Sequence, residues 1–128
     1  MSIRYQLNET IMGSGISAVK VQSFSNVAHV QISEDVPTDE TDLEIALVLD
    51  VDQIAFVYIN STQDVTFETN IAATPDNTIA LTANNPYVWH TGSYHALLLT
   101  VDITKIFITN TSGSTAEVTV WALYDSTP

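Results

Sequence analysis

The sequence predicts an all-β fold, a single domain built as an antiparallel β-sandwich of the jelly-roll type. Helix signals are almost absent, β-branched residues are abundant, and apolar residues recur at every second position. About eight to ten such runs follow one another, separated by turn-forming residues. The length of 128 residues and the hydrophobic content of 45 % suit one folded domain with its own core.

Residues 1–15 are predicted to be an N-terminal arm or the first strand, ahead of a β-sandwich domain at 16–128. Apolar and polar residues alternate along the first part of this segment, and it ends in a glycine-rich stretch typical of a turn or a hinge. An extended arm can add a strand to the exposed edge of a neighbouring sheet. We therefore expect it to bind a partner through Ile3, Arg4, Tyr5 and Leu7.

The first half of the sandwich domain contains four predicted strands, at 16–24, 27–32, 43–49 and 54–59. Between them, residues 33–42 hold a proline and five carboxylates, a composition typical of a solvated loop. Calcium binding by this acidic region is an alternative, but no EF-hand spacing is present.

The second half contains six predicted strands, at 64–69, 78–82, 87–90, 97–101, 103–109 and 117–123. The segment 96–101 is largely apolar on both faces, and such a strand needs cover on both sides. Cover by another subunit predicts a homo-oligomer, with a trimer favoured, in which Leu97 and Leu99 are contact residues. Cover by a long loop of the same chain is the alternative.

Aromatic residues gather between positions 87 and 95. Tyr87 and Trp89 share one face of their predicted strand, and Tyr94 follows shortly after it. Aromatic side chains are favoured in protein interfaces and also stack on sugars. We expect these three residues to serve the core and a subunit interface, with sugar binding as the alternative.

One internal similarity relates residues 54–67 to residues 103–120. Each segment has an apolar strand, a polar turn and then an acid-Val-Thr-apolar strand. The pattern predicts two similar hairpins in two quasi-equivalent halves of a sandwich. Convergent strand chemistry is the alternative to duplication.

The sequence lacks the spacings by which catalytic and metal-binding residues are recognised. The chain has no cysteine, and the spacing of its three histidines is not that of a zinc site. Nucleophile elbows, phosphate loops and acid pairs in an apolar setting are missing from the pattern. We therefore predict no enzymatic activity, no metal and no cofactor.

Charge and hydropathy argue against nucleic-acid-binding and membrane-spanning proteins. Three Lys and Arg against 15 Asp and Glu give a net charge of −12, which is unsuited to nucleic acid binding. The longest apolar run, at 54–59, is too short for a membrane span, and the first residues lack the apolar core of a signal peptide. We expect synthesis in a host cytoplasm, no membrane partner, and a place outside the shell of any particle that packages DNA.

Several phrases from residue 54 onward resemble a group of small, cysteine-free β proteins encoded among the virion genes of tailed phages. The phrases are DVTFETN (64–70), PDNTIAL (75–81), VWH (88–90), ITNTSGS (108–114) and VWALYD (120–125). They are strand-and-turn phrases, so the resemblance transfers no functional residues. It implies a virion structural protein on the outer surface of the head, a decoration or cement protein that binds the major capsid protein or another virion protein. A tail, fibre or collar component and a carbohydrate-binding module are the alternatives.

Overall fold

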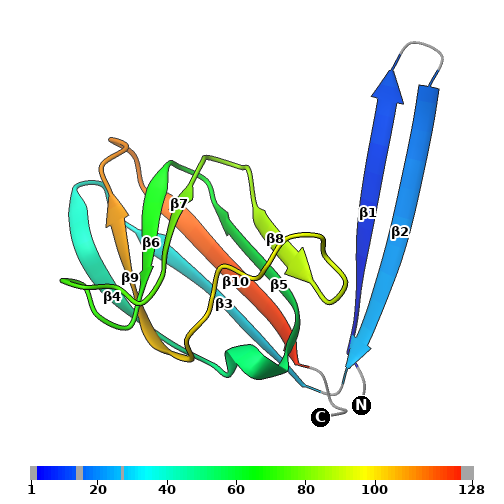
Figure 1. Ribbon diagram of the computed structural model, residues 1–128. Coiled ribbons are helices and arrows are strands. Elements are labelled where there is room, and N and C mark those ends of the chain that lie inside the picture. The colour runs from blue at the N-terminus through cyan, green and yellow to red at the C-terminus, as the bar shows by residue number, and fades with distance from the viewer. Residues whose placement is uncertain (1–2, 14–15, 27, 125–128) are drawn as a thin grey trace.

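Strands dominate the structure, as predicted (Figure 1). The computed structural model describes residues 3–13, 16–26 and 28–124, with side chains from His29 to Tyr124. The first sheet has the order β3 (Ala28–Val36), β10 (Ala116–Tyr124), β5 (Ile54–Ser61) and β8 (Tyr87–His90). The second sheet has the order β4 (Glu40–Leu49), β9 (Ile103–Asn110), β6 (Val65–Thr69) and β7 (Thr78–Leu81). The two sheets pack face to face, which confirms the predicted β-sandwich.

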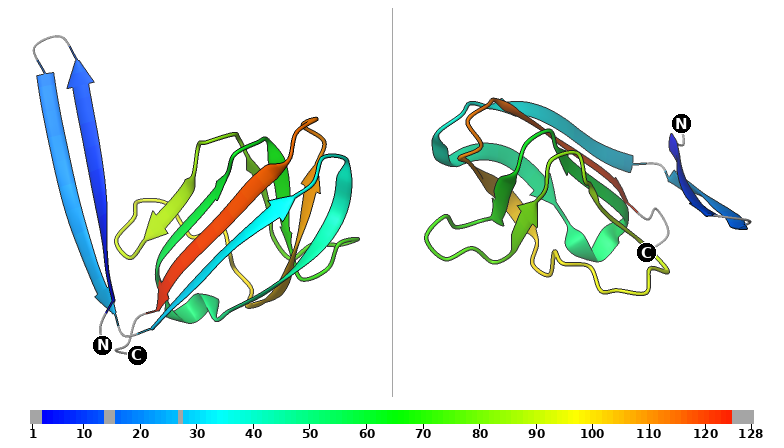
Figure 2. Two further views of the ribbon diagram at one scale, coloured as in Figure 1. Left: turned by 180° about the vertical axis from the view of Figure 1, so that it is seen from behind. Right: turned by 90° about the horizontal axis from the view of Figure 1, so that it is seen from above.

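The N-terminal residues form a separate antiparallel hairpin of β1 (Ile3–Gly13) and β2 (Ile16–Asn26). The hairpin extends to the side of the sandwich in every view, and only its base lies near the sandwich (Figures 1 and 2). Residues 16–26, which the sequence pattern assigns to the sandwich, pair with β1. The predicted glycine-rich hinge includes residues 14 and 15, which lie outside the described residues.

The eight strands of the sandwich pair in a nested order. β6 pairs with β7, β5 with β8, β4 with β9 and β3 with β10, always antiparallel. Residues 28–124 therefore form one long hairpin, which folds over so that β5 also pairs with β10 and β6 with β9. This arrangement is the predicted jelly roll.

The two similar segments occupy equivalent places, but the prediction that each is a hairpin is wrong. β5 and β6 lie in different sheets, and so do β9 and β10. The polar turn in each segment carries the chain across the core to the opposite sheet. Because β5 pairs with β10 and β6 with β9, an approximate two-fold relation exchanges the segments and the sheets.

The core lies between the two sheets because buried and accessible residues alternate along the strands. In β6, Val65, Phe67 and Thr69 are buried, whereas Thr66 and Glu68 are partly accessible. Burial of one large apolar side chain of this kind contributes about 1.5–3 kcal/mol. The fully buried apolar residues of the core include Leu49, Val57, Ile59, Phe67, Leu99, Ile103, Ile106, Ile108, Val118 and Val120.

The predicted loop at 33–42 is wrong over most of its length. β3 continues to Val36 and β4 begins at Glu40, so only residues 37–39 separate the two strands. Both are edge strands, and alternate residues of an edge strand can face water, so that carboxylates are tolerated there. Asp39 has a φ of 64°, a conformation that aspartate tolerates in tight turns.

The predicted strand at 97–101 is also wrong, because this segment is an irregular loop between β8 and β9. The backbone N–H of Leu98 donates to the Tyr87 hydroxyl at 3.0 Å, a side-chain partner in place of a neighbouring strand. Leu99 points into the core and is 1 % exposed, whereas Leu98 and Val101 are exposed. The apolar character of this segment thus comes from Leu99 in the core, from Leu97 packed against it, and from exposed loop residues.

Asn110 joins the two turns at one end of the sandwich. Its side chain is fully buried, and Nδ2 donates to the carbonyl oxygens of Val36 at 3.0 Å and Ser114 at 2.8 Å. Its Oδ1 accepts from the backbone N–H of Ser112 at 3.1 Å. One amide therefore satisfies backbone groups of the β3–β4 turn and the β9–β10 turn.

We expect Asn110→Ala to lower the free energy of unfolding by roughly 2–4 kcal/mol, because it leaves several buried backbone groups unsatisfied. Asn110→Asp has a similar shape but cannot donate to the carbonyls when ionised, so it should be at least as harmful at pH 7. Urea unfolding measures both. The exposed Asn85→Ala serves as the control, and an Asn110 variant as stable as this control would contradict the assigned role.

Candidate interaction surface

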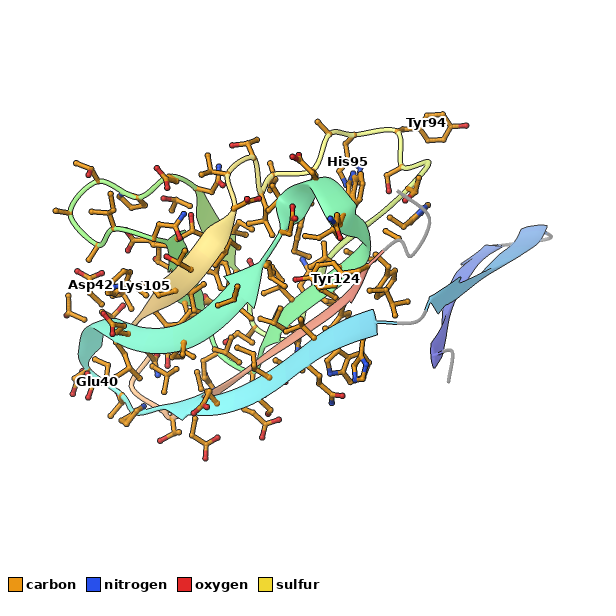
Figure 3. All side chains as sticks on the ribbon, turned by 90° about the horizontal axis from the view of Figure 1, so that it is seen from below. Glu40, Asp42, Tyr94, His95, Lys105 and Tyr124 are labelled. Carbon is orange, nitrogen blue, oxygen red and sulfur yellow. The ribbon has the colours of Figure 1, made fainter. Side chains whose placement is uncertain are left out.

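The outer faces of the two sheets differ in chemistry. The outer face of the second sheet carries Glu44, Lys105 and Glu68 on neighbouring strands. It also carries Phe107, the direct partner of Glu44 and Glu68, and the exposed Val48. Lys105 Nζ lies 3.7 Å from Glu44 Oε1, but both side chains are largely exposed, so this ion pair contributes little to stability. Figure 3 shows Lys105 and Asp42 on this side of the sandwich. This face therefore mixes charged residues with large apolar ones and, among the described residues, has no aromatic stack like that of the first sheet.

The outer face of the first sheet is apolar along two neighbouring rows. One row runs across the four strands as His29, Leu123, Phe56 and His90, and the next as Gln31, Trp121, Tyr58 and Val88. We call the five central residues the apolar patch: Phe56, Tyr58, Val88, Trp121 and Leu123.

The apolar patch is a side-chain cluster separate from the core. Tyr58 and Trp121 stack with their ring centroids 5.2 Å apart and an interplanar angle of 30°. Phe56 is 5 % exposed and Leu123 is fully buried, yet neither belongs to the hydrophobic cluster between the sheets. Tyr58, Trp121 and Val88 are partly accessible. Because Phe56 and Leu123 are already buried within the chain, only the partly accessible Tyr58, Trp121 and Val88 can offer apolar surface to a partner.

Two carboxylates lie on the same outer face, two rows away from the stacked aromatic rings. Asp35 of β3 and Glu117 of β10 are direct cross-strand partners, and both are exposed. Like charges placed directly opposite each other destabilise a sheet. We call them the acidic pair, and a cation from a partner molecule would relieve their repulsion.

The N-terminal candidate residues lie in the hairpin. Ile3, Tyr5 and Leu7 occupy alternate positions of β1 and therefore share one face of the ribbon, whereas Arg4 occupies the other. The structure thus separates Arg4 from the three apolar candidates. Whether these residues bind a partner stays a prediction.

The aromatic candidates do not form one surface. Tyr87 and Trp89 pack against the core, and Trp89 Nε1 donates to the carbonyl oxygen of His95 at 3.0 Å. Burial raises the pKa of Tyr87, while its hydrogen bond from the Leu98 N–H acts in the opposite direction. Both residues therefore anchor the loop that follows β8. Tyr94 is fully exposed at the outer side of that loop (Figure 3).

The two leucine candidates are separated as well. Leu97 is half-buried against the core, and Leu99 lies within it, so Leu99 offers no surface to a partner. The sequence patterns did not identify the aromatic residues of the apolar patch as candidate binding residues. Their signal was present, because residues 54–59 are apolar on both faces, which one layer of core cannot explain.

The features of the described residues that bear on catalysis are their potential metal ligands and an open pocket. It contains no cluster of three or more potential metal ligands. An open, polar pocket of about 390 Å³ is lined by Gln63, Asp64, Ala83, Thr111 and Ser112, without a nucleophile–base pair. The residues described also include no helix of the length and hydropathy needed to cross a membrane.

Glu68 is the carboxyl group with a perturbed environment. Partial burial raises the pKa of Glu68, and the nearby Asp42 raises it further through charge repulsion and a hydrogen bond. Asp42 is held in place by Thr109, whose Oγ1 accepts from the Asp42 backbone N–H at 3.0 Å. This pair lies on the second sheet, away from the apolar patch.

Comparison with known proteins identified no relative: no family model matches the chain, and no curated protein or solved structure matches it.

We expect Glu68→Gln to stabilise the protein at pH 7. The raised pKa means that the folded state binds a proton more readily than the unfolded state, so the group's contribution to stability declines as pH rises through the folded-state pKa. The gain from Glu68→Gln should therefore be largest at neutral pH and shrink as pH falls below the ordinary value of 4.5. Thermal unfolding across this range measures the effect.

Glu34→Gln is the matched control, because it also removes one carboxylate from a strand but lies on an exposed edge. Equal gains in both variants would attribute the effect to net charge and contradict the local cause.

Proposed function

We propose that this protein is a virion structural protein that decorates the outer surface of a phage head and stabilises it. It acts by association, without a chemical reaction. The observation that carries the proposal is a β-sandwich with two features suited to protein binding. These are the apolar patch on its first sheet and the hairpin that extends away from the sandwich. Both features suit binding to large protein surfaces.

The fold and the sequence resemblance support the same class of protein. Jelly rolls occur in viral capsid proteins, and also in lectins, so the fold alone does not assign the function. The resemblance of residues 54–125 to small phage virion proteins favours the capsid setting. The sugar-binding alternative is less favoured, because Tyr87 and Trp89 pack inward and leave Tyr94 alone at the surface.

The charge of the protein suits a position outside the shell. At −12, it is repelled by packaged nucleic acid. Electrostatics therefore favours the exterior of a DNA-filled head. There the acidic surface of the sandwich faces solvent, and the apolar patch and the hairpin face the capsid protein.

The stabilising mechanism is repeated burial of apolar area. Each buried Å² of apolar surface contributes about 25 cal/mol to the free energy of binding. Much of this gain is offset by the entropy lost on association, so the net binding free energy of one subunit is modest. Repetition over a capsid lattice, and linkage of subunits into a homo-oligomer such as a trimer, multiply the effect through avidity.

The proposal predicts that particles lacking this protein lose resistance to heat or to low salt, and that added purified protein restores it. Light scattering during a thermal ramp measures particle disruption, and electron microscopy locates the protein. Density over the head in high copy number is the expected result. Density at the tail or collar in low copy number would replace decoration with the tail assignment, and unchanged melting of depleted heads would refute stabilisation.

A further inference from the structure

We propose that the outer face of the first sheet binds a partner protein that presents a lysine or arginine beside an apolar side chain. The cation lies over the acidic pair, Asp35 and Glu117, and the apolar side chain lies over Trp121. This inference rests on the proposed function, because it names the chemistry of the protein surface on which the sandwich docks. It is carried by the acidic pair, by the accessible aromatic rings, and by the row of residues between them.

The acidic pair has no compensating cation in the described part of the sandwich. Lys105 is the only lysine or arginine among the described side chains, and it lies on the second sheet beside Glu44. Asp35 lies seven residues along β3 from Ala28, a span of about 23 Å. The hairpin joins β3 at the Ala28 end and extends away from this face (Figures 1 and 2). A positive charge for the pair therefore comes from another molecule.

The apolar part of the site is the accessible part of the aromatic stack. Tyr58 and Trp121 stack with their ring centroids 5.2 Å apart, and both remain partly accessible, as does Val88 beside Tyr58. Phe56 and Leu123 are buried within the chain, so they are not part of the contact. Accessible aromatic rings bind apolar side chains, and their faces also attract the guanidinium group of arginine.

The row between the rings and the carboxylates offers hydrogen-bond acceptors. Asn60 and Thr119 are direct cross-strand partners in this row. The Oδ1 atom of Asn60 is buried and accepts no hydrogen bond from any described residue. A buried acceptor without a donor is unfavourable, and lysine and arginine side chains carry donors only. After a small rotation of the Asn60 amide, a cationic side chain lying along this row would supply the missing donor.

The register of the sheet sets the spacing that the partner must match. Glu117 and Trp121 lie four residues apart on the same face of β10, which corresponds to about 13 Å. The partner therefore presents its cation and its apolar side chain about 13 Å apart. Residues i and i+4 of an extended strand have this spacing and share one face.

Charge argues against the other occupants of this face. A second copy of the chain would bring its own acidic pair into the interface, at a net charge of −12 on each copy. Nucleic acid is repelled for the same reason. A sugar would stack on the rings but would leave the two carboxylates without a positive charge, so a basic protein surface is the better fit.

Charge reversal in the full chain tests the acidic part of the site. We expect Asp35→Lys to raise the dissociation constant for purified heads that lack the protein about tenfold or more, because it replaces an attraction with a repulsion. The same substitution should raise the thermal midpoint of the free protein, since it places a lysine opposite Glu117. Weaker binding by a more stable chain separates loss of the contact from loss of the fold.

Glu34→Lys is the matched control for this reversal. It changes the net charge by the same amount at the adjacent position, which is also exposed but lies on the opposite face of β3. We expect its dissociation constant to stay within about twofold of the wild-type value.

A second pair of variants tests the apolar part of the site. We expect Val88→Asp to weaken binding to the heads about tenfold, because Val88 lies beside Tyr58 on the outer face of the first sheet. Val48→Asp is the same substitution at an exposed position of the second sheet, and it should leave binding unchanged. Thermal unfolding checks that both variants are folded.

A sensor surface coated with a synthetic peptide tests the recognition chemistry without particles. The peptide carries a leucine and a lysine four residues apart in a serine–threonine background, and dense coating imitates a repeated lattice. Wild-type protein and Glu34→Lys should bind it, Asp35→Lys should bind about tenfold more weakly, and a peptide with glutamate in place of the lysine should not be bound.

Equal affinities of Asp35→Lys and Glu34→Lys for the heads and for the peptide would overturn the inference. So would binding of maltohexaose that Val88→Asp abolishes, without binding of the basic peptide, because it would assign this face to sugars. The proposed function is judged separately. Wild-type protein that binds heads with no effect of Asp35→Lys or Val88→Asp refutes this site alone, and a chain that binds the peptide through Asp35 but not the heads refutes decoration alone.

Discussion

The central pairing of β5 with β10 and of β6 with β9 is the constraint on which the rest of the structure depends. These four strands are the inner strands of the two sheets, and their inward residues supply most of the core. The other strands are added at the edges, and Asn110 fixes the turns at one end. The sandwich is therefore a rigid base on which surface features keep their spacing.

The two sheets use this base differently. The outer face of the second sheet presents mostly charged and polar residues, with Phe107 and Val48 among them. The first sheet carries aromatic and aliphatic residues in two rows across β10, β5 and β8, with a like-charge pair beyond them. This asymmetry appears in the sequence of β5, which is apolar at consecutive positions because both of its faces carry apolar residues.

Much of the fold could be predicted from the sequence because period-two alternation and turn residues are local signals. The limits of β5, β6, β7, β8 and β9 follow closely from them. The nested pairing order needed the three-dimensional structure, since partners such as Ala28 and Tyr124 are distant in sequence. A strand is wrongly predicted around Leu99 because a loop residue that inserts into a core has the same hydropathy as a strand residue. The apolar patch was missed for the related reason that a two-faced apolar strand does not reveal which face is the core.

The nested order also has a consequence for the making of the protein. β3 near the start of the sandwich pairs with β10, and β4 pairs with β9, so the first sheet can be completed only after β10 has been made and the second only after β9. Non-local pairing of this kind folds slowly, typically in milliseconds to seconds. Until β10 has been made, β5, which is apolar on both faces, lacks this neighbour and exposes apolar surface that favours aggregation.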